Sequence, residues 1–163
     1  MGVELIPVDF PDSTVYPFNI MDVVISAECA AAFDDFTRND IDDLMTRQNL
    51  FDWPNTFRVS RFVPAVEYIN ANRHRYLLMQ KVNEVVSQYD AIICPSRGGG
   101  NQSAITNLTG HPVVCVPTGL DAKSGLPTGI SFVGKLYDEG TLLRIAQFYQ
   151  DHTAYEEVHP ALF

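Results

Sequence analysis

The first half of the chain carries apolar residues that recur mainly with the period of an α-helix. Residues 3–10 are the exception, because apolar and polar side chains alternate there until Pro11, which predicts a short strand. Helical spacing covers residues 19–36 and returns over residues 64–88. We therefore expect one strand and two helices in this half, with residues 44–62 left unassigned.

Short apolar runs are characteristic of the second half. Residues 91–94, 113–117 and 129–134 are three such runs, each next to a Pro or Gly, as is typical of buried strands. Residues 105–110 predict a helical turn, and residues 138–149 predict a helix. Helices that alternate with short strands predict an α/β fold, a layered mixed β-sheet flanked by helices.

The length and composition predict one globular domain. The chain has 163 residues, of which 46% are hydrophobic and 19% charged. It is therefore too apolar for a disordered protein and long enough to bury a core. We expect a single domain over residues 1–163.

The charge narrows the classes of partner. The chain holds 20 acidic against 11 basic residues, a formal net charge of −9. Nucleic acids and anionic membrane surfaces are bound chiefly through positive charge, so neither is an expected partner. The first residues lack the basic and apolar regions of a signal peptide, and no apolar run is long enough to span a bilayer. A cytoplasmic location is expected.

The three cysteines are widely spaced and form no C-x-x-C pair. Cys29, Cys94 and Cys115 lie in apolar segments, which is typical of small buried side chains in a reducing compartment. The histidines share no metal-ligand spacing, so no metal site is predicted.

A polar, glycine-rich loop at residues 96–103 follows the first predicted strand of the second half. A phosphate-binding loop would begin at such a place, yet no Lys-Ser or Lys-Thr pair follows the glycines. Ser103 stands where the dinucleotide-binding motif needs a third glycine. A loop at the rim of a pocket is the favoured interpretation.

Two other groups of residues admit a chemical role. Cys94 and His111 are the one Cys–His pair worth considering as nucleophile and base, but Cys94 ends an apolar run and His111 lies in a turn. Arg73, His74 and Arg75 could bind an anion, but adjacent helical positions point in different directions, so a solvated face is favoured.

Other conspicuous residues of the second half are interpreted as structural. Asn107 lies in a predicted turn, where its side chain can satisfy backbone groups. Four glycines are interpreted as positions of backbone freedom rather than of chemistry, namely Gly110, Gly119, Gly129 and Gly134.

Three segments of the second half resemble, in order, motifs of the amidase signature family. They are Y-D-A-I-I-C-P-S at 89–96, I-T-N-L-T-G-H-P-V-V-C-V-P-T-G-L at 105–120 and G-L-P-T-G-I-S-F-V-G at 125–134. The resemblance is strongest from about residue 64 to residue 150, and it implies the C-terminal portion of the amidase signature fold. It also implies the family activity, hydrolysis or transfer of carboxamide nitrogen, which needs no metal or organic cofactor.

The catalytic residues of that family are a Lys base, a bridging Ser and a nucleophilic Ser, in a part of the family domain that precedes the matched segments. None of them can be carried over to this sequence, so no catalytic residue is predicted. The resemblance implies instead a part of the rim of a pocket for a small amide substrate. The residues expected at that rim are Ser96, Gly98, Gly99, Gly100, Asn101 and Thr106.

Two hypotheses of different class follow. The first is that the chain is the C-terminal portion of an amidase signature amidohydrolase, without the catalytic portion and inactive alone. The alternative is a non-catalytic binding or assembly module that retains the amidase C-terminal fold. In both cases a missing neighbour would leave apolar sheet surface uncovered, so a homo-oligomer or a partner chain is expected. Whether this chain is itself an enzyme is left open.

Overall fold

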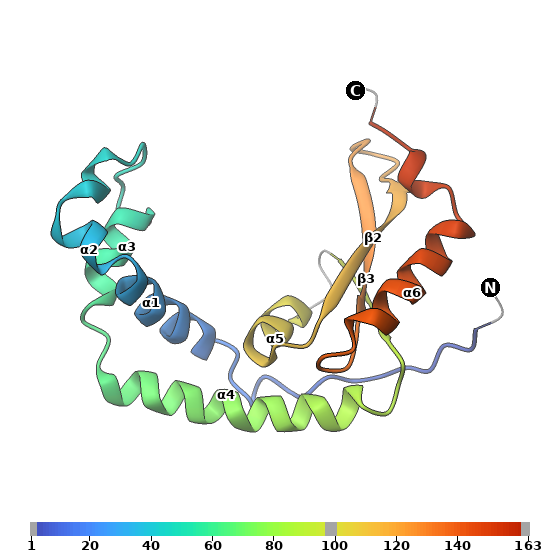
Figure 1. The fold of residues 1–163 in the computed structure, drawn as a ribbon, viewed down its shortest axis with the longest axis horizontal. Helices are drawn as coiled ribbons and strands as arrows, with labels where there is room; N and C mark the ends of the chain where they lie inside the picture. Colours follow the sequence, from blue (N-terminus) through green and yellow to red (C-terminus); the bar gives the residue numbers. More distant parts are fainter. Residues whose placement is uncertain (1–2, 97–100, 161–163) are drawn as a thin grey trace. The chain divides into compact units, whose positions relative to one another are not determined.

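Residues 3–96 and 101–160 are described by a computed structural model, and they form two compact units (Figure 1). The sheet unit combines Met1–Asp12 with Leu78–Phe163, and the helical unit is Ser13–Leu77. The long helix α4 (Ala65–Val86) contributes residues to both. Each unit is described by itself.

Three strands make the sheet of the sheet unit: β1 (Ile92–Pro95), β2 (Val113–Leu120) and β3 (Pro127–Val133). Their order is β1-β3-β2, and β3 pairs antiparallel with both neighbours. The predicted α/β class is confirmed, and so are the three predicted strands. The sheet was expected to be mixed, but the described strands pair only in the antiparallel sense.

A tight hairpin joins β2 to β3 and accounts for the antiparallel direction of this pair. The Asp121 carboxylate accepts hydrogen bonds from the backbone N–H groups of Lys123 and Ser124, and Gly125 takes a φ of 67°, which favours glycine. The same hydrogen bonds, led by those from Ser124, lower the pKa of Asp121. A turn this short can join only antiparallel neighbours.

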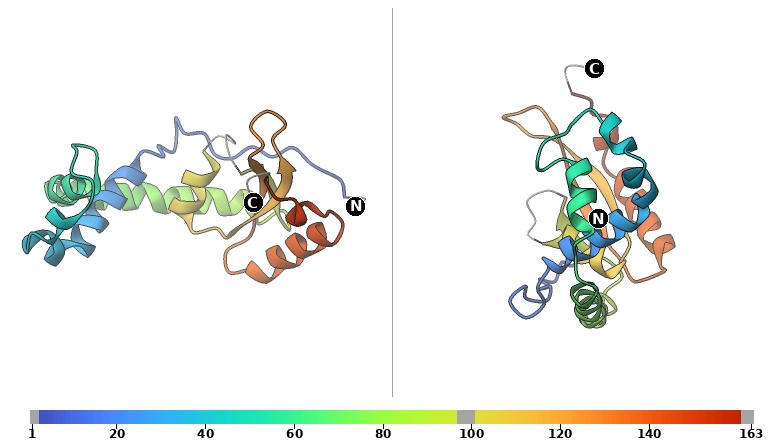
Figure 2. Two further views of the ribbon diagram at one scale, coloured as in Figure 1. Left: turned by 90° about the horizontal axis from the view of Figure 1, so that it is seen from above. Right: turned by 90° about the vertical axis from the view of Figure 1, so that its left-hand side faces the viewer.

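Helix α6 (Glu139–Asp151) packs on one face of the sheet (Figure 2). Phe132 of β3 and Val116 of β2 meet Leu142 and Ala146 of the helix in a buried cluster. Because successive side chains of a strand point to opposite faces, Ser131 of β3 faces away from α6. The packing of one helix therefore decides what lies on the other face of the sheet.

The remaining elements of the sheet unit are short. Helix α5 (Gln102–Thr109) follows the glycine-rich loop, and a 3-10 turn, η2 (Tyr155–Glu157), lies against β2. The predicted strand at residues 3–10 is wrong, because this segment has no regular structure and is mostly exposed. Alternation alone does not make a strand where no neighbour pairs with it, and Pro7 offers no N–H for pairing.

The helical unit contains α1 (Ile20–Ala32), α2 (Asp34–Arg38), the 3-10 turn η1 (Ile41–Leu44), α3 (Trp53–Ser60) and the first part of α4. The helix predicted over residues 19–36 is confirmed in place, but it is interrupted at Phe33, whose φ of −105° departs from helical geometry. The Phe33 ring stacks on that of buried Phe57, with centroids 4.6 Å apart. That aromatic contact holds α3 against the break.

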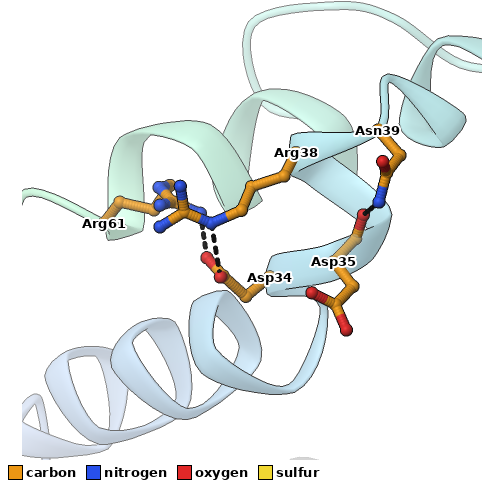
Figure 3. A network of polar contacts seen from close by, with 5 residues as sticks. All are labelled: Asp34, Asp35, Arg38, Asn39 and Arg61. Carbon is orange, nitrogen blue, oxygen red and sulfur yellow. Dashed lines mark hydrogen bonds and ion pairs between the residues drawn. The ribbon is translucent and has the colours of Figure 1, made fainter.

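Ion pairs fasten the short helices to one another. The Asp34 carboxylate pairs with Arg38, 2.6 Å away in its own helix, and with Arg61 beyond the end of α3 (Figure 3). Hydrogen bonding from Arg38 is the main reason that the pKa of Asp34 is lowered. Arg38 is largely exposed and the side chains of Asp34 and Arg61 are partly exposed, so the pairs orient the helices more than they stabilise them.

One ion pair of the helical unit has a fully buried member. The Asp42 side chain is 0% exposed, and its Oδ2 lies 2.6 Å from Nη2 of half-exposed Arg58. The contact has no hydrogen-bond alignment, so charge attraction is the main compensation for the buried carboxylate. Gln48 also holds the turn by donating to the backbone carbonyl of Asp42 at 2.8 Å.

Replacing Arg58 should therefore destabilise the protein. We expect Arg58→Ala to lower the free energy of unfolding by about 1–3 kcal/mol, because it leaves a buried charge unpaired. Arg38→Ala is the matched control: it removes an exposed pair within one helix and should cost at most about 0.5 kcal/mol. Urea unfolding measures both, and equal losses would contradict the importance of burial.

Gly134, just after β3, lies directly against Leu142 of α6. A Cβ placed there would lie 2.6–2.9 Å from Cγ, Cδ1 and Cδ2 of Leu142, which is 2% exposed and cannot retreat into solvent. At Gly140 in α6, by contrast, a Cβ would meet nothing within 4 Å. The two glycines thus differ in the room that a side chain would find at each position.

Alanine at these two positions should have opposite effects. We expect Gly134→Ala to lower the free energy of unfolding by about 1–3 kcal/mol through overpacking. Gly140→Ala should raise it by about 0.5–1 kcal/mol, because alanine favours the helix. Urea midpoints and slopes will show this, and an unchanged midpoint for Gly134→Ala would mean that β3 and α6 separate easily.

Candidate functional site

The Ser96 hydroxyl joins two side chains of neighbouring strands on the face of the sheet that α6 leaves free. Ser96 follows β1, and its Oγ lies 2.9 Å from Sγ of Cys115 on β2 and 3.0 Å from Oγ of Ser131 on β3. Ser131 is buried, whereas Ser96 and Cys115 are exposed. We call these three residues the hydroxyl–thiol cluster.

The strand register builds this cluster. Ser131 is directly opposite both Cys94 of β1 and Cys115 of β2, so the three side chains form one row across the sheet. Ser96, two residues after Cys94, lies on the same face and turns towards Ser131 and Cys115.

Gly129 provides the space beside the cluster. A Cβ at this position would lie 2.9 Å from the Val116 carbonyl oxygen, 3.2 Å from the Cys115 sulfur and 3.3 Å from the Ser96 oxygen. Its φ is not positive, so close approach and not backbone freedom explains this glycine. Backbone freedom does explain Gly110 and Gly119, whose φ values are 77° and 108°.

The other predicted rim residues have separate surroundings. Asn101 is exposed and precedes α5 without making a side-chain cap. Thr106 is buried within α5, and its hydroxyl donates to the carbonyl of Gln102 at 3.1 Å. Gly98, Gly99 and Gly100 lie outside the described residues. None of the hydrogen bonds seen among the described residues joins Ser96 to Asn101 or Thr106.

The cysteines differ from one another in surroundings, although all three are free thiols. Cys94 is buried, as expected, and burial raises the pKa of its thiol and disfavours the thiolate. The expectation that Cys115 is buried is wrong, because Cys115 belongs to an edge strand of the sheet and faces the side without α6.

His111 is a buried histidine with one polar contact. The ring is 3% exposed, and its Nδ1 lies 2.8 Å from the Thr109 hydroxyl at the end of α5, while Nε2 has no hydrogen-bond partner. Burial lowers the pKa of His111, which favours the neutral ring. No hydrogen bond between His111 and Cys94 occurs in the described part of the chain, so these residues do not form the dyad considered above.

The chemistry of the site is that of polar contacts, not of an activated nucleophile. Within residues 3–96 and 101–160, the members of the hydroxyl–thiol cluster bond to one another and to no His or Lys that could act as a base. The same residues contain no group of three His, Cys, Asp or Glu side chains that could hold a metal ion. None of their helices is both long enough and apolar enough to cross a membrane.

Sequence reasoning identified Ser96 but missed its partners. The signal was present in the hairpin, since pairing residues 113–120 with residues 127–133 puts Cys115 opposite Ser131. The approach of Ser96 could not be found in this way, because β1 is distant in sequence and its register with β3 is set by the fold.

Comparison with known proteins gives the chain clear relatives, although no protein-family model matches it. It is 32% identical over 125 residues to a subunit of the glutamyl-tRNA(Gln) amidotransferase of Halalkalibacterium halodurans, which we call the amidotransferase subunit. This match covers 66% of the chain and 25% of the amidotransferase subunit. The chain is 28% identical over 117 residues to the putative amidase AmiD of Mycobacterium tuberculosis, covering 59% and 24%. The chain thus spans about a quarter of the length of the curated relatives it matches.

Solved structures share the fold over most of the chain. The peptide amidase PAM bound to chymostatin has a TM-score of 0.73 at 19% identity, over 97% of this chain and 38% of PAM. A bacterial aryl acylamidase of the amidase signature family has a TM-score of 0.69 at 15% identity, over 94% and 37%. The corresponding amidotransferase protein from Thermotoga maritima has a TM-score of 0.58 at 23% identity, over 86% and 33%.

The free energy of unfolding of the protein should depend on pH through His111. The pKa of its ring is lowered in the folded protein relative to the ordinary value of 6.5. The folded state therefore resists protonation, and its free energy of unfolding should fall as the pH drops below 6.5. Each pKa unit of lowering corresponds to about 1.4 kcal/mol.

Urea unfolding between pH 8 and pH 5 measures this dependence. His111→Gln should flatten the acid side of the curve, whereas His152→Gln, at an exposed position, should leave it unchanged. A curve unaffected by His111→Gln would assign the pH dependence to other groups.

Proposed function

We propose that the chain, which is similar to part of the amidase signature proteins, serves as the pocket-rim portion of a carboxamide hydrolase or amidotransferase. In this proposal it acts on small amides together with a Lys base and two Ser residues from another part of the enzyme. The observation that carries it is the match to the amidotransferase subunit over 66% of the chain, joined to a fold shared with PAM over 97%.

The described side chains support a role in binding rather than in catalysis. Ser96 and Cys115 are exposed and hydrogen-bonded to each other, so both can rearrange to meet a polar ligand. A hydroxyl can donate to the carbonyl oxygen of a carboxamide or accept from its NH₂ group. The proposed rim comprises Ser96, Gly98, Gly99, Gly100, Asn101 and Thr106, and it needs no metal or organic cofactor.

Assembly is part of the same proposal. The relatives include proteins named as one subunit of glutamyl-tRNA(Gln) amidotransferase, and this chain spans only about a quarter of their length. We propose that it works as a homo-oligomer or with a partner chain, in the cytoplasm, where free thiols persist. The net charge of −9 gives no support to a nucleic acid or an anionic membrane as partner. The single domain expected over residues 1–163 stays a prediction.

The purified chain alone should release no ammonia from simple carboxamides such as glutamine and propionamide. A serine-directed fluorophosphonate should also leave it unlabelled, because none of the hydrogen bonds seen for the described serines joins a hydroxyl to a His or Lys side chain. The intact amidotransferase subunit of Halalkalibacterium halodurans should be assayed in parallel for comparison. Adding the portion of that protein that the match leaves uncovered should restore turnover.

Two results would contradict this function. Metal-independent turnover by the chain alone, abolished by Ser96→Ala, would make it a complete enzyme. Stable binding of carboxamides by thermal shift, with no turnover in any mixture, would favour the alternative of a non-catalytic binding module.

A further inference from the structure

Helix α4 changes character along its length. In its last part Leu78, Val82 and Val86 are buried to 1% exposure or less, at the spacing of one helical face. In the part that belongs to the helical unit, Ile69 is 57% exposed and Leu77 is 52% exposed. The first part of the helix thus carries large apolar side chains that are exposed, whereas those on one face of its last part are buried.

Two grooves flank this exposed part of α4, and both are lined entirely by the helical unit. One has a volume of about 620 Å³ and lies between α4 and the start of α1. The other has a volume of about 580 Å³ and is lined by α4 alone. Ile69 lines the second groove, and Arg73 and Leu77 line both. We call Ile69, Arg73 and Leu77 the α4 stripe, because their spacing of four residues places them on one side of the helix.

The α4 stripe also carries positive charge in an acidic chain. Arg73 lines both grooves and is the only charged residue among those that line the second, whereas Glu67 also lines the first and the whole chain has a net charge of −9. A surface of exposed apolar side chains around a cation is complementary to a partner segment that is apolar and bears a carboxylate.

We propose that the α4 stripe is the docking surface for the catalytic portion of an amidase signature enzyme, presented by an apolar segment with an acidic residue. This inference rests on the proposed function. The length of the relatives supports the occupant, because about three quarters of the amidotransferase subunit's length and about three fifths of PAM have no counterpart in this chain. Apolar residues exposed to this extent on a regular helix are typical of a surface that another part of the protein covers.

A second copy of the same chain fits this surface less well. A symmetric dimer through the second groove would bring the same patch of both copies together, so Arg73 would lie near its own equivalent around the axis. Like charges so placed oppose association, whereas a carboxylate from a different segment favours it.

The test uses the full chain and, as probe, the portion of the Halalkalibacterium halodurans amidotransferase subunit that the match leaves uncovered, co-expressed with a tag on the probe. Ile69→Glu and Arg73→Glu should each lower at least tenfold the amount of chain that co-purifies with the tagged probe, quantified relative to the probe. Val59→Glu on α3 is the matched control, because Val59 is 57% exposed, like Ile69, but lines neither groove. Circular dichroism melting checks that each variant folds.

The outcomes separate this inference from the proposed function. The α4 stripe is supported if Ile69→Glu and Arg73→Glu weaken binding and Val59→Glu does not. This holds even if the mixture shows no turnover, because a lack of turnover would count only against the proposed function. A mixture that turns over amides and binds equally well with all variants overturns the stripe and leaves the function standing. No complex with the wild-type chain, or a homodimer that Ile69→Glu dissociates, overturns the proposed occupant.

Discussion

The packing of α6 on the central strand is the contact on which the sheet unit depends. Phe132 commits one face of β3 to the helix, where it meets Leu142 and Ala146 in a buried cluster. Because neighbouring side chains of a strand point to opposite faces, the side chain of Ser131 then lies on the other face of the sheet. Antiparallel register on both sides of β3 adds Cys94 and Cys115 to the same row, and the chain after β1 brings Ser96 back to it. A hydrophobic contact on one side thus determines a polar site on the other.

The site also shows how a family fold can be separated from the family's chemistry. Hydroxyl and thiol groups are gathered within hydrogen-bond distance, yet their partners are each other. Such groups can recognise an amide, but they cannot attack one without a base. The hydroxyl–thiol cluster would need a base from elsewhere to act as a nucleophile, because the described part of the chain brings none to it.

The predictable parts of the molecule are those with a local cause. Apolar runs next to Pro or Gly predicted all three described strands, and the residues between β2 and β3 have the chemistry of a tight turn. The strand prediction for residues 3–10 was wrong because a strand also needs a neighbouring strand to pair with. The alternation of apolar and polar residues describes only the segment itself. Exposure of Cys115 depends on strand order, which places β2 at an edge, and the break at Phe33 depends on a ring from α3. Of the candidate site, Ser96 could be predicted from its loop, but its contacts with Ser131 and Cys115 required the register.

The contact between Gly134 and Leu142 also constrains how this sequence can change over time. A methyl group at 134 is opposed by the leucine, and a smaller residue at 142 alone would leave a cavity. Each single step is unfavourable, although the pair exchanged together could fill the same volume. The two positions are therefore energetically coupled, and their substitutions should not be additive. Among distant relatives we expect the residues at these two positions to covary. A larger residue at position 134 should occur together with a smaller residue at position 142.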